Sequence, residues 1–185
     1  ISLEVLEEDG TLIRRFITRN TEEPDPVSGK LEVRKGLNSF AWDMQYPGAL
    51  TFPGMIMWAG NTRGPLALPG SYRARLTLNG VSREVPFEIL PDPASTSTAA
   101  DLKAQFDFLM EIRDKLTETH RAITDIRKLR EEILRLQARV PENAGEFGKL
   151  LASTLGEMKE IEEALYQTRN RSSQDPLNYP IRLNN

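Results

Sequence analysis

An aromatic residue and an acid stand side by side in the stretch FAWDMQYPGAL, at Trp42 and Asp43. This pairing raises the question of glycosidic chemistry, which needs two carboxyl groups facing each other, about 5–9 Å apart. Asp43 has no evident partner acid and stands at the end of a predicted strand. An aspartate in that place commonly hydrogen-bonds the loop that follows. We therefore interpret Asp43 as a residue that organises the loop and Trp42 as a core residue.

A second candidate site lies in the Gly- and Pro-rich segment 52–65, which carries Met55, Met57 and Trp58. An exposed tryptophan can stack on a sugar ring or fill a partner's pocket. Trp58 and Tyr46 together would form such a platform for carbohydrate. The alternative is a long loop folded over the open end of the domain, with its apolar residues in the core. Apolar residues in number are usually buried, which favours the loop.

Other chemistries find little support in the sequence. The chain has no cysteine and a single histidine, so thiol nucleophiles, thiolate metal sites and multi-histidine zinc sites are excluded. No Gly-rich phosphate loop is present, and no cofactor or metal is expected. His120 lies near an apolar helical stripe, which favours helix packing over general-base chemistry. The acidic run GEMKEIEEAL is most simply a solvated helix face.

Charge and hydropathy limit the partners. The formal net charge is −3 and no basic face is evident, which argues against nucleic acid. No apolar run approaches the roughly 20 residues of a membrane-spanning helix. The first residues, ISLEVL, already have the pattern of a strand. We therefore expect that processing has cut the chain before Ile1.

The first half of the chain reads as strands. Asp9-Gly10 and Asn79-Gly80 are strong hairpin signals, and GSYRARLTLNGVSREVPFEIL alternates apolar and charged residues. About six short strands separated by turns suggest an all-β sandwich of immunoglobulin or fibronectin type. We assign this domain to residues 1–92, followed by a Pro-containing linker at 93–98.

The second half reads as helices. Thr98 and Asp101 form a predicted capping box, after which apolar residues recur at three- and four-residue steps. The stretch RVPENAG interrupts this pattern, and a second apolar stripe follows. Two helices joined by a short loop predict an all-α antiparallel helical hairpin over residues 99–170. The last segment, 171–185, is expected to be an extended polar tail.

Two quoted segments carry a resemblance. GLNSFAWDMQYPGA followed by GPLALPGSYRARLTLNG resembles the Ig-like module found in the flagellar hook-cap assembly protein and at the ends of many exported bacterial proteins. The matching positions are Trp42, Asp43, Gly48, Gly70 and Tyr72. The ordered series through FPGMIMWAG, ADLKAQFDFLMEIRDKL and YQTRNRSSQDPLNYPIRLNN is similar to the C-terminal region of bacterial BNR-repeat (Asp-box) glycosyl hydrolases and sortilin-like proteins.

The resemblance implies that a β-propeller of Asp-box repeats precedes this region in an exported parent protein. The repeat pattern S-x-D-x-G-x-T-W is itself absent, with only a faint echo in EEDGT at residues 7–11. No residue of this chain therefore inherits the hydrolase activity of the family. We expect a non-catalytic accessory region that docks on the propeller. The alternatives are a carbohydrate-binding module and a fragment that contributes to a glycoside hydrolase.

Overall fold

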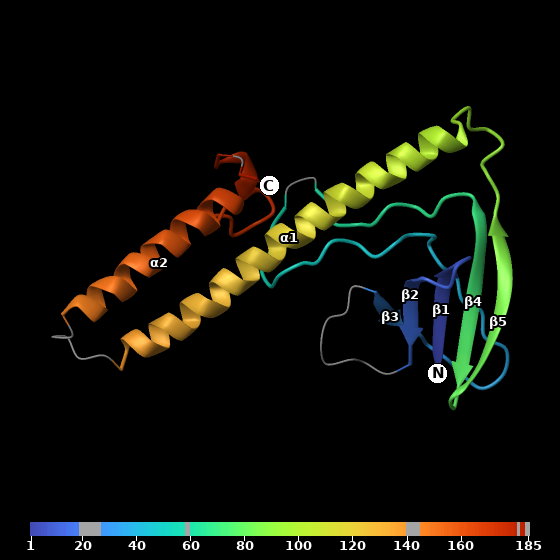
Figure 1. Ribbon diagram of the computed structural model, residues 1–185, viewed down its shortest axis with the longest axis horizontal. Helices are drawn as coiled ribbons and strands as arrows, with labels where there is room; N and C mark the ends of the chain where they lie inside the picture. Colours follow the sequence, from blue (N-terminus) through green and yellow to red (C-terminus); the bar gives the residue numbers. More distant parts are fainter. Residues whose placement is uncertain (19–26, 58–59, 140–144, 181, 184–185) are drawn as a thin grey trace. The chain divides into compact units, whose positions relative to one another are not determined.

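The computed structural model describes residues 1–18, 27–57, 60–139, 145–180 and 182–183 (Figure 1). Packing contacts divide the chain into two compact units, and neither is continuous in sequence. The sheet unit comprises Ile1–Ala49 and Arg63–Asp114. The helix unit comprises Leu50–Thr62 and Lys115–Asn185.

The sheet unit is built on one open sheet with the strand order β3-β2-β1-β4-β5. Strand β1 pairs antiparallel with both β2 and β4, β4 pairs antiparallel with β5, and β2 pairs parallel with β3. The sheet is therefore mixed, with open edges at β3 and β5. The strand bounds are Ser2–Glu7 (β1), Leu12–Ile17 (β2), Ser28–Lys30 (β3), Gly70–Leu78 (β4) and Val81–Ile89 (β5).

Both hairpin turns predicted from the sequence are confirmed. Asn79 and Gly80 connect β4 to β5 with φ of 49° and 82°, the two positive values that a tight two-residue turn requires. Gly10, with φ of 91°, lies in the turn between β1 and β2, where the Thr11 N–H donates to Asp9 Oδ1 at 2.8 Å. Local turn chemistry thus sets the register of β4 and β5, whereas the register of β1 and β2 also shifts at an irregularity between Val5 and Leu6.

The two faces of the sheet differ in chemistry. One face carries a ladder of ion pairs, in which Glu4 contacts Arg15 at 2.8 Å and Arg75 at 3.2 Å, and Arg75 contacts Glu84 at 2.7 Å. The opposite face is apolar and forms the core, together with the first part of the long helix. Its buried residues are Val5, Ile13, Phe16, Leu31, Tyr46 and Tyr72.

The prediction of an all-β Ig/fibronectin-like sandwich followed by an antiparallel helical hairpin is wrong, because the strands that the structure describes form one open sheet. Among its described residues, the segment 31–69, expected to supply further strands, contains only an isolated bridge between Gln45 and Leu66. Its parts within the sheet unit, 31–49 and 63–69, pack on the apolar face as coil. A second sheet on the opposite face would bury the ladder of charges centred on Glu4, at a large desolvation cost.

The helical region also differs from the predicted hairpin. Helix α1 (Ala99–Gln137) has 39 residues and helix α2 (Glu146–Leu165) has 20. The N-terminal part of α1 packs on the sheet core through Phe106 and Met110, so only its later part belongs to the helix unit. Within that unit α2 lies alongside α1 (Figure 1). A 3₁₀ helix at Asp175–Leu177 (η1) follows in the C-terminal segment.

The start of α1 follows the sequence prediction. The Thr98 hydroxyl accepts the Asp101 N–H at 3.2 Å, and Asp101 Oδ2 accepts the Thr98 N–H at 2.9 Å. These reciprocal bonds form a capping box that satisfies two backbone donors. The Thr98 hydroxyl also donates to Asp101, and these bonds lower the pKa of that carboxyl.

Candidate functional site

Trp42 and Asp43 lie at a corner where coil covers the sheet. The Trp42 ring packs edge-on against Tyr72 at 6.3 Å and Phe87 at 6.4 Å, and its indole N–H donates to the Gln45 carbonyl at 3.2 Å. Asp43 is exposed, and its Oδ1 accepts the Gln45 N–H at 3.1 Å. The aspartate therefore holds a turn, and the tryptophan is a half-buried neighbour of the core.

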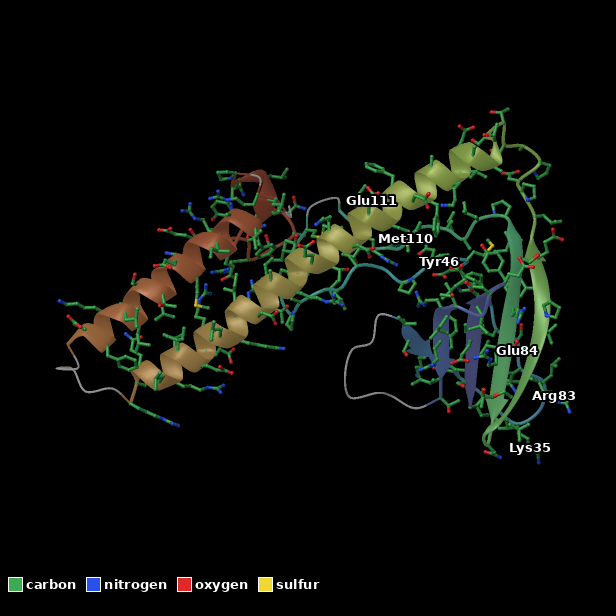
Figure 2. The ribbon with its side chains drawn as sticks, viewed as in Figure 1. Lys35, Tyr46, Arg83, Glu84, Met110 and Glu111 are labelled. Atoms are coloured by element: carbon green, nitrogen blue, oxygen red, sulfur yellow. The ribbon has the colours of Figure 1, made fainter. Side chains whose placement is uncertain are left out.

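Of the two residues of the predicted carbohydrate platform, the structure describes Tyr46. Tyr46 is only 9% exposed, its ring packs against Phe106 at 4.9 Å, and its hydroxyl donates to Glu7 at 2.8 Å. In Figure 2 it lies beside Met110 of α1. A sugar stacks on an open ring face, which Tyr46 does not offer. Trp58, the other predicted residue, lies outside the described residues.

The other three positions that carry the resemblance are Tyr72, Gly70 and Gly48, and their contacts are with the fold itself. Tyr72 is buried, and its hydroxyl donates to the Leu68 carbonyl at 2.7 Å, which fixes the loop that enters β4. Gly70 begins β4 with φ of 154°. Gly48 lies in half-buried coil next to the buried Ala49.

The buried tyrosines predict an alkaline transition. Burial, and then the hydrogen bond to the Glu7 carboxylate, raise the pKa of Tyr46, and burial likewise raises the pKa of Tyr72. A raised pKa means that the folded state favours the neutral phenol. This contribution to stability is complete below the unfolded tyrosine pKa of about 10 and is lost as the pH rises through the folded-state value. We expect the free energy of unfolding to fall steadily above about pH 10.

The measurement is urea unfolding at a series of alkaline pH values, for the native chain and for Tyr46→Phe. The variant loses one hydrogen bond, and we expect it to be about 1 kcal/mol less stable at neutral pH. It should nevertheless lose less stability between neutral and alkaline pH, because one titrating group has been removed. Equal pH slopes for the two proteins would contradict this account of Tyr46.

An apolar surface lies on the core-side face of the β4–β5 hairpin. The register places Leu76, Leu78, Val81 and Val85 on the same face as Tyr72, but beyond the part of that face that the coil covers. We call these four residues the strand surface. Val81 is 67% and Val85 63% exposed, so most of each side chain meets solvent. In Figure 2 Arg83 and Lys35 lie at this same end of the sheet.

An apolar hollow adjoins the strand surface. It has a volume of about 510 Å³ and its lining includes Phe40, Trp42 and Phe87. Phe40 is itself 41% exposed. Hollow and strand surface together give the sheet unit an exposed apolar region of the kind that marks interaction sites on soluble proteins.

The open edge of β5 is less suited to recognition than its face. Leu78 and Val81 close the two-residue turn, so they form a hydrogen-bonded pair. Bonded and non-bonded pairs alternate, which makes Arg73 and Pro86 a non-bonded pair and turns the Pro86 nitrogen away from β4. Pro86 thus removes a donor from the free edge and hinders the addition of another strand.

The helix unit contains a buried ion cluster. The Glu162 side chain is 3% exposed and lies 2.8 Å from Arg127 Nε and 2.6 Å from Arg130 Nη2. The Arg130 contact is an ion pair without the alignment of a hydrogen bond. The Arg127 guanidinium also lies over the rings of Phe52 at 4.7 Å and Tyr166 at 5.7 Å. One carboxylate therefore joins two cations to an aromatic pair.

Residues 50–57, which we call the strap, pack on the helices of this unit. The Leu50 carbonyl contacts His120 Nδ1, and the Leu50 N–H donates to the Thr117 hydroxyl at 3.3 Å. Farther along, the Ile56 N–H donates to the Tyr166 hydroxyl at 2.8 Å. The Phe52 ring packs edge-on against both His120 and Tyr166. His120 is thus a packing residue, only 1% exposed, that holds the strap to α1.

Reasoning from the sequence missed this cluster, although a signal was present. Glu162 stands in the acidic run that was interpreted as a solvated face. It also stands four residues after Met158 and three before Leu165, so it lies on the apolar stripe of α2. Arg127 follows the buried Ile123 by four residues in the same way. Charges on the apolar stripes of two helices predict a buried ion pair.

The described residues offer neither a metal site nor a membrane-spanning helix. Among the residues that the structure describes, no three or more histidine, cysteine, aspartate or glutamate side chains are grouped so as to hold a metal ion. Within the same part of the chain, neither helix combines the length and the apolar character needed to cross a membrane. Comparison with known proteins finds no match to a family, to a curated protein or to a solved structure.

Proposed function

We propose that this chain is a non-catalytic interaction region of a larger exported protein, and that the strand surface docks on a preceding propeller-like domain of the same polypeptide. The observation that carries the proposal is the exposure of Val81 and Val85 beside an apolar hollow. Burying an exposed valine stabilises an interface by about 1.5 kcal/mol or more. The preceding domain and the exported setting rest on the resemblance of the segments around Trp42 and Tyr72.

The chemistry of the buried acids supports a structural role. Glu162 is held by Arg127 and Arg130, and Glu4 is held by Arg15 and Arg75. In each case the carboxylate faces cations, whereas glycoside hydrolysis needs two carboxyl groups that face each other across a substrate. Asp43 is likewise occupied with the Gln45 backbone. The carboxylates of Glu162, Glu4 and Asp43 are thus engaged in contacts that stabilise the fold.

The test is hydrogen exchange in the β4–β5 hairpin, measured in this chain and in a longer polypeptide that includes the preceding domain. Docking should slow exchange there by about tenfold or more, which corresponds to about 1.4 kcal/mol. The double substitution Val81→Thr, Val85→Thr keeps β-branched side chains but removes apolar surface, and it should abolish the difference. The matched control is Leu136→Gln, at an exposed apolar position of α1. Equal exchange in the two polypeptides would contradict the proposal.

A further inference from the structure

A groove in the helix unit is lined by four basic, three acidic and three uncharged side chains. It has a volume of about 640 Å³ and lies along α1, α2 and the turn after α2. Its cations are Arg127, Arg130, Lys159 and Arg171, and we call it the arginine groove. It belongs to a different unit from the strand surface, so it bears on a separate activity.

The cations of the groove are only partly neutralised. Three acids line it, and Glu162 must serve both Arg127 and Arg130. Glu163 lies 3.9 Å from Lys159, at the limit of an ion pair. The third acid, Glu131, lies 3.4 Å from Arg135, which is not part of the lining. The groove therefore has an excess of positive charge, in a chain whose formal net charge is −3.

Arg171 is held in place by neutral groups. Its Nη1 donates to the Thr168 carbonyl at 2.8 Å and to the Asn170 carbonyl at 3.2 Å. These bonds orient the guanidinium, and the nearby Asp175 carboxylate offsets only part of its charge. The neighbouring carboxylate, Asp175, accepts the backbone N–H groups of Arg171 and Ser172. An oriented guanidinium loses less entropy when it binds an anion.

From this arrangement we infer that the arginine groove binds an organic carboxylate with a short hydrocarbon body. A guanidinium presents a planar fork of N–H donors that matches the two oxygens of a carboxylate. Arg171 supplies such a fork, and Arg130, whose Nη2 contacts Glu162, adds a second cation. Leu134 and Leu155 also line the groove and give the hydrocarbon part of the ligand an apolar wall. A bare inorganic anion would leave that wall unused.

Three probes that differ in charge and in hydrocarbon chain separate the contributions. Hexanoate carries both a carboxylate and a chain, sulfate carries charge alone, and hexanamide carries the chain without charge. Each is titrated at constant ionic strength, because salt screens exposed charges. The readout is the arginine side-chain N–H resonances in heteronuclear NMR. We expect saturable shifts at Arg130 and Arg171 with hexanoate, and weaker binding of the other two probes.

Substitution tests whether the shifts come from the groove. Arg171→Gln removes an exposed side chain and should weaken hexanoate binding by about tenfold, the usual loss for a charged hydrogen-bond partner. Arg121→Gln makes the same charge change at an exposed position of α1 outside the groove and should leave binding unchanged. Thermal unfolding of both variants shows that the fold is retained.

Each possible result either supports the inference or overturns it. Loss of hexanoate binding in Arg171→Gln alone supports the inference. Equal weakening by Arg121→Gln would overturn it, because attraction would then follow overall charge. Equal affinity for sulfate, or for hexanamide, would overturn the assigned ligand class. No saturable shift with hexanoate would overturn the site itself.

Discussion

Phe52→Ala is expected to lower the free energy of unfolding of the helix unit by about 3–5 kcal/mol, the usual cost of truncating a buried phenylalanine. Phe52 is 5% exposed and packs edge-on against His120 at 5.3 Å and Tyr166 at 5.1 Å. Its removal also takes away the ring beneath the Arg127 guanidinium. The strap would then keep few apolar contacts with the helices. The measurement is urea unfolding followed by far-UV circular dichroism, which reports the helices.

Two further variants serve as controls for Phe52→Ala. Phe52→Leu keeps much of the volume and should recover part of the loss. Phe108→Ala removes the same ring from a position of α1 that is 62% exposed, and we expect a change within about 0.5 kcal/mol. If Phe52→Ala destabilises the chain no more than Phe108→Ala does, then the strap contributes little to the helix unit.

Glu162→Ala should cost about 3 kcal/mol, the low end of the range for a buried ion pair, because Arg127 and Arg130, which are 33% and 28% exposed, lose the carboxylate that they share. Arg127 and Arg130 each approach Glu162 within 2.8 Å, and they would repel each other once it is gone. Removal of one partner from a buried ion cluster is far more damaging than replacement of the whole cluster by apolar residues. Chemical unfolding measures the loss directly.

The control for Glu162 lies two residues earlier on the same helix. Glu160 is exposed, and Glu160→Ala should change stability by less than about 0.5 kcal/mol. Glu162→Gln, which keeps the shape but removes the charge, should show most of the loss seen with alanine. Similar stabilities for Glu160→Ala and Glu162→Ala would show that the ion cluster is dispensable.

Much of the local structure was predictable because it depends on neighbouring residues. The turns at Asp9-Gly10 and Asn79-Gly80, and the capping box at Thr98, each involve four residues or fewer. Their backbone requirements are met by residue types that stand next to each other in the chain. The helical period of α1 is equally local, since it recurs with every turn.

The architecture was mispredicted because the alternation of residues within single strands was taken as evidence for a fold of two sheets. The alternation in β4 and β5 correctly indicates a sheet with one dry and one charged face, but a sandwich needs two sheets. Arg75 and Glu84 lie on the charged face with Glu4, and these two outer members of the ladder are partly exposed. The stretch around Phe40 and Trp42 has strand-like composition but packs on the sheet as coil. Composition alone does not distinguish these outcomes.

The helix-unit cluster was harder to predict, because its members are far apart in sequence. The strap precedes its partners on α1 by about 70 positions, as the contact between Leu50 and His120 shows. No periodicity links such segments. What the sequence does contain is the position of Glu162 on the apolar stripe of α2, which indicates a buried partner without identifying it. The arginine groove arises from the same long-range arrangement.

Because both units are discontinuous in sequence, some segments are synthesised long before the segments that they contact. The backbone passes from one unit to the other after Ala49, after Thr62 and after Asp114. Phe52 leaves the ribosome long before Tyr166, because Tyr166 follows Ile56 by 110 positions. A nascent chain must therefore carry an unsatisfied apolar strap until those later residues have been made. Contacts that close such long loops form slowly, so the helix unit is the part whose assembly a chaperone would have most reason to protect.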